Sequence, residues 1–172
     1  MKKNSVLLSE IKSFKGNVLG IGDIDKKIVE ALNKNKNVME LNILSNNEYN
    51  IGSQNEKGKI KKLSIKRIRK LKHKRVNYLV VDYNNIDEYL ASFIKDSIYI
   101  TKDYIYFVTN DKDIKKYYDR YNTKIKEIKC SDESIYVIDV SKAKNNIFKE
   151  FIYSIIDSFK KLIDIITNLL LS

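Results

Sequence analysis

A short segment ending in Gly20-Ile21-Gly22 constrains the fold of this 172-residue chain more than any other feature. The apolar run from Asn17 to Ile21 predicts a buried strand that leads into these glycines. Apolar residues at helical spacing then predict a helix over 24–33, and the apolar run over 38–44 predicts the next strand. A strand, a tight turn, a helix and a second strand form a right-handed crossover unit, so the two strands are expected to be parallel neighbours.

The rest of the chain extends this unit to a larger α/β domain. Residues 45–58 are polar and contain glycine, which predicts a long loop. Ser64 is expected to cap a helix in which Ile65, Ile68 and Leu71 lie beneath basic side chains. We therefore predict a Rossmann-like three-layer sandwich with a mostly parallel sheet and a C-terminal antiparallel hairpin. The further elements expected are a short amphipathic segment over 6–11, strands over 76–82, 97–101 and 104–109, helices over 86–94 and 111–121, and hairpin strands over 123–130 and 134–140.

The chain divides into a predicted α/β domain over 1–140 and an amphipathic helix within 141–172. Apolar residues recur in a heptad pattern from Phe148 to Leu169. The six charged residues between Lys149 and Asp164 are too many for a membrane-spanning helix. The apolar face of residues 147–171 needs a partner. A second copy of the chain, a membrane surface and the domain itself are the three alternatives.

The net charge of +11 comes from one stretch of the sequence. The chain has 33 basic and 22 acidic residues, and residues 57–75 hold 11 basic residues and no acidic one. The remainder is neutral. Such a basic segment is typical of a surface that meets the phosphates of nucleic acid or of an anionic membrane, although a charged run can also be a solvated face. The residues predicted to bind anions are Lys66, Arg67, Arg69, Lys70, Lys72 and Arg75.

One histidine and one cysteine narrow the possible chemistry. With His73 as the only imidazole, a histidine-based catalytic triad or a histidine metal site has few residues to draw on, and no metal site is predicted. Cys130 cannot form an internal disulfide, which favours a reducing, cytoplasmic location, with attachment to the membrane periphery as an alternative.

The crossover unit resembles the class I S-adenosylmethionine-dependent methyltransferases. That family opens with an apolar strand and a glycine-rich turn, carries an acid on the following strand and ends with a two-stranded hairpin. The resemblance implies that Gly20, Gly22, Asp23 and Glu40 hold S-adenosylmethionine. It also implies that Asp82, which ends a later strand, is the catalytic residue beside the transferred methyl group. The alternative role for Asp82 is to cap the turn that follows the strand.

The glycine-rich turn is a degenerate form of the family's motif. Gly20 stands where the family has an acid, and Ile24 and Asp25 stand where it has small residues. Two carboxylates, Asp23 and Asp25, at the start of the helix would repel a phosphate and disfavour a dinucleotide. Two functions stay open. The chain is either a methyltransferase-like protein that binds S-adenosylmethionine, or a non-catalytic module that binds nucleic acid or an anionic membrane through residues 57–75 and the C-terminal helix.

Overall fold

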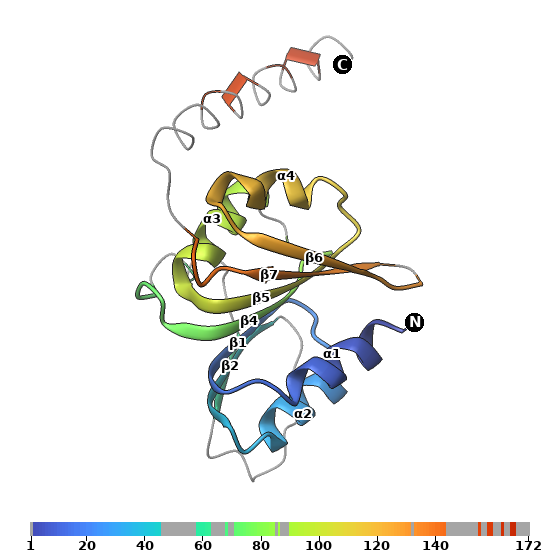
Figure 1. The fold of residues 1–172 in the computed structure, drawn as a ribbon, viewed down its shortest axis with the longest axis vertical. Helices are drawn as coiled ribbons and strands as arrows, with labels where there is room; N and C mark the ends of the chain where they lie inside the picture. Colours follow the sequence, from blue (N-terminus) through green and yellow to red (C-terminus); the bar gives the residue numbers. More distant parts are fainter. Residues whose placement is uncertain are drawn as a thin grey trace.

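A computed structural model describes residues 2–45, 58–62, 68, 71–84, 86, 90–131 and 133–143 of the chain, together with residues 155, 158–159, 163 and 166–167 (Figure 1). The described helices and strands make up one α/β domain. In chain order they are α1 (Lys3–Ile11), β1 (Gly16–Ile21), α2 (Lys26–Lys34), β2 (Val38–Ser45), β3 (Gly58–Lys62), β4 (Val76–Asp82), α3 (Leu90–Ile100), β5 (Thr101–Thr109), α4 (Ile114–Tyr118), η2 (Asp119–Tyr121), β6 (Lys124–Lys129) and β7 (Ser134–Asp139).

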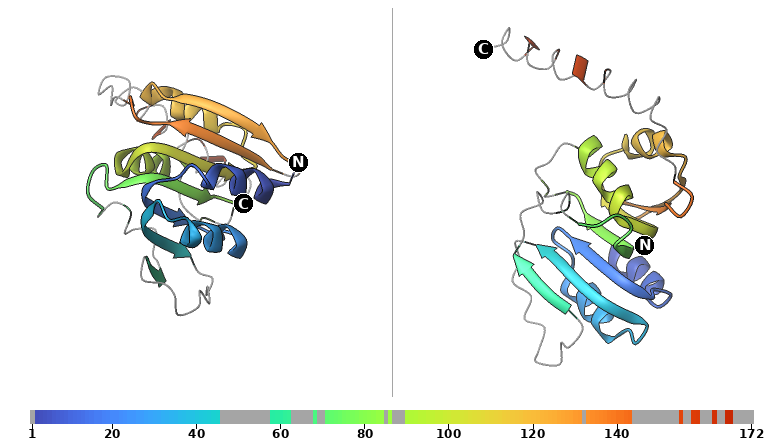
Figure 2. Two further views of the ribbon diagram at one scale, coloured as in Figure 1. Left: turned by 60° about the horizontal axis from the view of Figure 1, so that its bottom comes forward. Right: turned by 90° about the vertical axis from the view of Figure 1, so that its left-hand side faces the viewer.

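The seven strands form one sheet in the order β3-β2-β1-β4-β5-β7-β6. Strands β1 to β5 are parallel to one another, whereas β7 runs antiparallel to both β5 and β6. Helices α1 and α2 cover one face, and α3 and α4 cover the other (Figures 1 and 2). This arrangement confirms the predicted Rossmann-like sandwich with a mostly parallel sheet and a C-terminal hairpin.

Each face of the sheet has its own apolar core. Val6, Leu7 and Ile11 of α1 pack with the apolar stripe of α2 over β1, β2 and β4. Phe93 and Ile94 of α3 pack with α4 on the opposite face. Strands β1 and β4 lie between two apolar layers, which explains why the sequences that form them are nearly continuous apolar runs.

One predicted strand is helical instead. Residues 97–101 are rich in β-branched and aromatic side chains, which suggested a strand, but α3 continues to Ile100 before β5 begins. The reason is burial. Leu90, Phe93, Ile94 and Ile98 recur at helical spacing and lie in the core, and this packing outweighs the local strand propensity. The helix predicted over 111–121 is divided into the short helix α4 and the 3-10 helix η2.

The basic segment begins with a strand that the sequence pattern did not predict. Residues 58–62 form β3, which is the edge strand of the sheet beside β2. Ile68 is 1% exposed in the core beneath α3, and Leu71 packs against the same core, as their spacing predicted. Ser64 and most of the helix predicted to follow it lie outside the described residues. The predicted loop over 45–58 also lies largely outside them.

The C-terminal helix is described at only a few positions. Residues 155, 158–159, 163 and 166–167 are helical, and the apolar side chains of Ile155, Phe159, Ile163 and Ile166 are 42–61% exposed. Within the described part of the chain, no helix combines the length and the apolar character that crossing a membrane requires.

Candidate functional site

The candidate site lies where β1 and β4 end side by side. Gly20 and Ile21 pair with Val80 and Val81, so the turn after β1 lies next to Asp82 at the end of β4. Gly22 has a φ of +90°, and a Cβ atom placed there would lie 2.1 Å from the carbonyl oxygen of Asp82. Its amide donates a hydrogen bond of 2.9 Å to the Leu44 carbonyl. Glycine is therefore required at position 22 by backbone conformation and by the close approach of β4.

Gly20 makes room for two core side chains. A Cβ atom at this position would lie 2.6 Å from the Cδ1 atoms of both Ile24 and Ile43. Ile24 is 4% exposed and packs in the core between α2 and the sheet. The isoleucine that replaces a small residue of the family's motif thus uses the space that the missing side chain of Gly20 leaves.

Asp82 is held by a lysine from the first helix. The Lys3 ammonium lies 2.9 Å from Oδ2 of Asp82 and 2.8 Å from Oε2 of Glu133, on the segment between β6 and β7. The Asn84 amide bridges the same two carboxylates, at 3.2 Å from Asp82 and 3.0 Å from Glu133. The backbone amide of Asn110 donates to the side-chain oxygen of Asn84. These contacts tie the ends of β4, β5 and the terminal hairpin to α1.

Electrostatics favour this bridge. Burial lowers the pKa of Lys3, but hydrogen bonds and charge attraction from Glu133 and Asp82 outweigh burial and leave the pKa above its usual value. The side chains of Lys3 and Asp82 are only 28% and 12% exposed, so solvent screens their attraction less than it screens a surface pair. The ammonium therefore stays charged at neutral pH.

Helix α1 also contacts the turn after β1. Asn4 donates a hydrogen bond of 2.9 Å to the Asp25 carboxylate, whose other oxygen caps α2 by accepting from the Lys27 amide. Beneath these contacts, the cavity lined by Lys3, Leu7, Ile24 and Asp82 among others has a volume of about 10 Å³, room for at most one water molecule. Side chains of the protein therefore fill the space between α1 and the ends of β1 and β4.

Glu40 lies at the other end of its strand. It is the third residue of β2 and pairs across the sheet with Asn17, near the start of β1. Its carboxylate is 2.9 Å from the Arg75 guanidinium. Ser45 ends β2 on the side of the candidate site, and its hydroxyl lies 3.5 Å from the Asp23 carboxylate. The structure does not bring Glu40 together with Gly20 and Gly22, contrary to what the resemblance implied, because Glu40 lies five positions before Ser45, the last residue of β2.

The basic segment is described at its two ends. β3 carries Lys59, Lys61 and Lys62 at the edge of the sheet. Lys72 is exposed, and Arg75 is half exposed beside Glu40. Four predicted anion-binding residues lie outside the described residues: Lys66, Arg67, Arg69 and Lys70.

One lysine of the basic segment has a structural role. The Lys74 ammonium donates to the carbonyl oxygens of Thr101, Ile98 and Val140, at 2.6, 3.4 and 3.4 Å. Burial lowers the pKa of Lys74, and the charge of Asp103 opposes this shift. This side chain anchors the segment between α3 and the end of β7, and its hydrogen bonds are directed into the protein.

Sequence reasoning missed the partners of Asp82. Lys3 and Glu133 are far from Asp82 in the sequence and belong to no motif, so only the fold brings them together. An acid at the end of a strand was a signal for Asp82 itself, but no sequence pattern marks a lysine that will neutralise it.

Comparisons with known proteins identify the fold and no more. No model of a known protein family and no curated protein matches the sequence. Solved structures do match. Spermidine synthase from Thermotoga maritima is 13% identical, with a TM-score of 0.57 over 80% of this chain and 57% of the synthase. A protein from Sulfolobus solfataricus assigned to the type 11 methyltransferases is 12% identical, with a TM-score of 0.57 over 80% of this chain and 90% of that protein.

An enzyme crystallised with S-adenosylhomocysteine is similar to the same degree. The O-methyltransferase from Bacillus cereus is 13% identical, with a TM-score of 0.56 over 81% of this chain and 82% of the enzyme. The chain therefore has the fold of the S-adenosylmethionine-dependent methyltransferases. This chain spans little more than half the length of spermidine synthase.

The described residues do not fit S-adenosylmethionine in the way the resemblance implied. Gly20 and Gly22 lack side chains because Ile24, Ile43 and the Asp82 carbonyl occupy the adjacent space. The Asp82 carboxylate is bound to Lys3, and Glu40 lies at the opposite end of β2. The methyltransferase fold is present, but Asp82 is paired within the chain and Glu40 lies away from the two glycines.

Proposed function

We propose that this protein is a methyltransferase-fold module that binds nucleic acid through the basic segment, residues 57–75, and does not transfer methyl groups. The observation that carries the proposal is the ion pair of Lys3 with Asp82 and Glu133, beside a turn packed against β4. The residue predicted to act on the methyl group is neutralised by the protein itself. In this proposal the fold is a support that holds the basic segment at the surface.

The charge distribution supports nucleic acid as the partner. Residues 57–75 hold 11 basic residues and no acidic one, and the rest of the chain is balanced. Burial of Ile68 and packing of Leu71 fix this segment to the domain. A cationic segment on a folded support can neutralise several phosphates of a nucleic acid at once and release their counterions.

The test is binding of a fluorescently labelled single-stranded RNA of 20 nucleotides, measured by anisotropy between 50 and 300 mM salt. We expect the logarithm of the association constant to fall linearly with the logarithm of salt concentration. Replacing Lys59, Lys61 and Lys62 with glutamine should make that slope shallower by about two, since each phosphate contact on a single strand contributes about 0.7.

A matched variant controls for net charge. Lys27, Lys34 and Lys36 are exposed residues on and just after α2, and their replacement with glutamine removes the same three charges. This control should keep the wild-type slope. Equal slopes for both triple variants would contradict a site in the basic segment. Binding to vesicles that contain anionic lipid, without binding to RNA, would assign the segment to a membrane and overturn the proposal.

The absence of methyl transfer has a separate test. Calorimetry of the folded protein with S-adenosylmethionine and with S-adenosylhomocysteine at millimolar concentration should give no binding heat. Saturable binding of either compound would restore the enzyme hypothesis, whatever the RNA experiment shows.

We also propose that the C-terminal helix pairs with a second copy of the chain. Ile155, Phe159, Ile163 and Ile166 are exposed and fall within a sector of about 80° at 3.6 residues per turn. The charges of residues 147–171 sum to zero, which favours another protein over an anionic membrane as partner. Sedimentation equilibrium should give a dimer. A monomer at micromolar concentration, or a dimer unaffected by replacement of Phe159 and Ile163 with serine, would contradict this proposal.

A further inference from the structure

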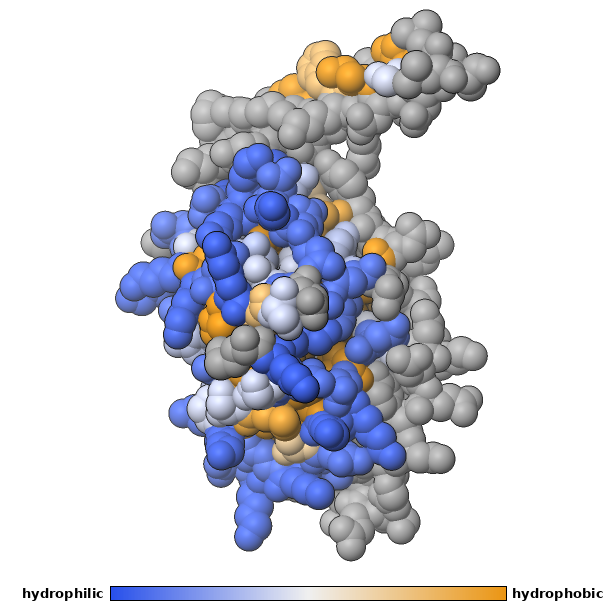
Figure 3. Space-filling view, turned by 90° about the vertical axis from the view of Figure 1, so that its right-hand side faces the viewer, coloured by the Kyte–Doolittle hydropathy of each residue, from blue (hydrophilic) through white to orange (hydrophobic). Residues whose placement is uncertain are grey.

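A second hollow lies farther along the same edge of the sheet. It has a volume of about 510 Å³ and lies between the end of β5, the start of α4 and the β6–β7 hairpin. Such a volume is typical of sites for small molecules. The surface that faces outward at this edge is mainly hydrophilic over the described residues (Figure 3). Its lining includes Thr109, Lys112, Lys115, Lys129 and Ser134, together with the two acids Glu127 and Glu133.

The two acids of this cavity each have a cation beside them. The Lys115 ammonium lies 2.6 Å from the Glu127 carboxylate, which also accepts a hydrogen bond of 3.1 Å from Ser134. The hydrogen bond from Lys115 lowers the pKa of Glu127, and Ser134 and the charge of Lys129 contribute in the same direction. Glu133 lies 2.8 Å from Lys3.

Two lysines of the cavity have no acid paired with them in the described part of the chain. Lys112 precedes α4 and Lys129 ends β6, and no ion pair among the described residues includes either. The Thr109 hydroxyl accepts a hydrogen bond from the Asp111 amide, so its proton can be donated to a ligand oxygen. Two ammonium groups and a hydroxyl donor thus line a cavity in which each acid also has a cation beside it.

We propose that this cavity binds a small organic phosphate, with the phosphate group between Lys112 and Lys129. A phosphate monoester carries a charge of about −1.5 to −2 at neutral pH, which matches the two unpaired lysines. The volume leaves space for the organic part of the ligand beside Tyr136 and Cys130, which also line the cavity.

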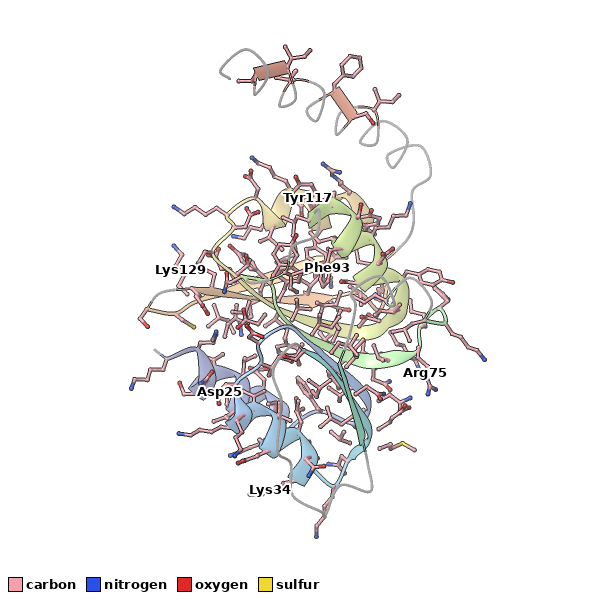
Figure 4. The ribbon with its side chains drawn as sticks, turned by 180° about the vertical axis from the view of Figure 1, so that it is seen from behind. Asp25, Lys34, Arg75, Phe93, Tyr117 and Lys129 are labelled. Atoms are coloured by element: carbon pink, nitrogen blue, oxygen red, sulfur yellow. The ribbon has the colours of Figure 1, made fainter. Side chains whose placement is uncertain are left out.

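This site is separate from the basic segment. Figure 4 shows Lys129 and Arg75 on opposite sides of the molecule, because β6 ends where β4 also ends and Arg75 precedes the start of β4. Binding at the cavity therefore does not depend on the proposed nucleic-acid site.

The experiment is titration of the full chain, at low salt, with ribose 5-phosphate, adenosine 5′-monophosphate, inorganic phosphate and neutral adenosine, followed by calorimetry and by NMR of the backbone amides. We expect saturable 1:1 binding of both organic phosphates and no binding of adenosine. Amide shifts should centre on Thr109, Lys112 and Lys129. Lys112→Gln and Lys129→Gln should each weaken binding by about tenfold, as expected for loss of one charge-assisted contact.

Two exposed lysines supply matched controls. Lys102 is the second residue of β5 and Lys124 is the first residue of β6, each at the far end of a strand that borders the cavity. Lys102→Gln and Lys124→Gln should leave the affinity unchanged. Equal losses in all four variants, or no saturable binding, would overturn the proposal. Binding of inorganic phosphate but neither organic phosphate would also overturn it, by assigning the site to the free ion.

Discussion

Two neighbouring regions along one edge of the sheet differ in what their side chains do. Where β1 and β4 end, Lys3, Ile24 and Asp82 bind or pack against one another and leave a cavity of about 10 Å³. Where β5 and β6 end, the cavity is about 510 Å³, and two of its lysines have no acid partner among the described residues. Only the first region is marked by a motif in the sequence, the turn Gly20-Ile21-Gly22.

This difference shows that the fold sets where a ligand site can form, whereas individual side chains set whether a ligand can enter it. Parallel α/β sheets gather loops at the carboxyl ends of their strands, so both regions lie where such folds bind ligands. Whether a ligand can enter depends on individual side chains, such as the isoleucine over Gly20 and the lysine beside Asp82. The glycines of a recognisable motif can therefore have a packing role of their own.

Gly22→Ala tests the close packing between the turn after β1 and the end of β4. A Cβ at Gly22 would lie 2.1 Å from a backbone oxygen, at a φ of +90°, so the turn would have to move. We expect a loss of about 3 kcal/mol in the free energy of unfolding, measured with urea. Gly20→Ala is the milder comparison, because it meets the flexible ends of two isoleucines, and it should cost about 1–2 kcal/mol. An unchanged stability for Gly22→Ala would contradict the packing role.

The next largest effect should come from Lys3→Met. This change leaves Asp82 and Glu133, with side chains 12% and 21% exposed, without their shared cation. We expect the free energy of unfolding to fall by about 2 kcal/mol at neutral pH. Lys12→Met, at an exposed residue just after α1, should change it by less than about 0.5 kcal/mol. Equal effects of the two variants would mean that the bridge adds no stability.

The stability that Lys3 confers should also depend on pH. Its pKa in the folded protein is above the ordinary value of 10.5. The contribution is therefore complete below that ordinary value and is lost as pH rises through the folded-state pKa. The difference in stability between the wild type and Lys3→Met should be constant from pH 7 to 9 and should shrink in more alkaline solution. Urea titrations at each pH measure it, and a difference that already shrinks between pH 7 and 9 would contradict the assignment.

The smallest effect that we expect is a change in the pKa of Glu127 in the cavity between β5 and β6. Lys115 is half exposed, and its contact with Glu127 is the main cause of the lowered pKa of that carboxyl group. Lys115→Gln should move the pKa of Glu127 up towards its ordinary value, as NMR titration of the side-chain carboxyl carbon would show. Lys116→Gln, which loses a contact with Asp113 instead, should leave Glu127 unchanged. A pKa of Glu127 that responds equally to both changes would disprove this pairing.

Sequence patterns predicted the crossover unit and the sheet because local and tertiary preferences agree there. The strand from Gly16 to Ile21, the helix α2 and β2 begin and end within two residues of their predicted limits. The prediction of a strand over 97–101 was wrong, because packing in the core on the α3 face favours a helix over the local strand propensity. Strand β3 was not predicted, because its short, basic sequence is typical of a surface segment. It lies at the edge of the sheet and pairs with β2.

The candidate site was predictable only in part. Gly22 and Asp82 were placed together correctly, because a turn and a strand end at adjacent positions of parallel strands. Glu40 was misplaced along its strand, since spacing from Gly22 says little about which end of β2 a residue will reach. The contacts of Lys3 and the cavity of about 510 Å³ could not be predicted, because each depends on contacts between distant segments.

The bridge from Lys3 also bears on the order in which the chain folds. Its partner Asp82 is 79 residues away, and Glu133 is farther still. Contacts of such large separation form only after the intervening chain has been organised. Helix α1 is thus expected to dock among the last elements, and pulsed hydrogen exchange during refolding should protect the amides of α1 later than those of β4 and β5.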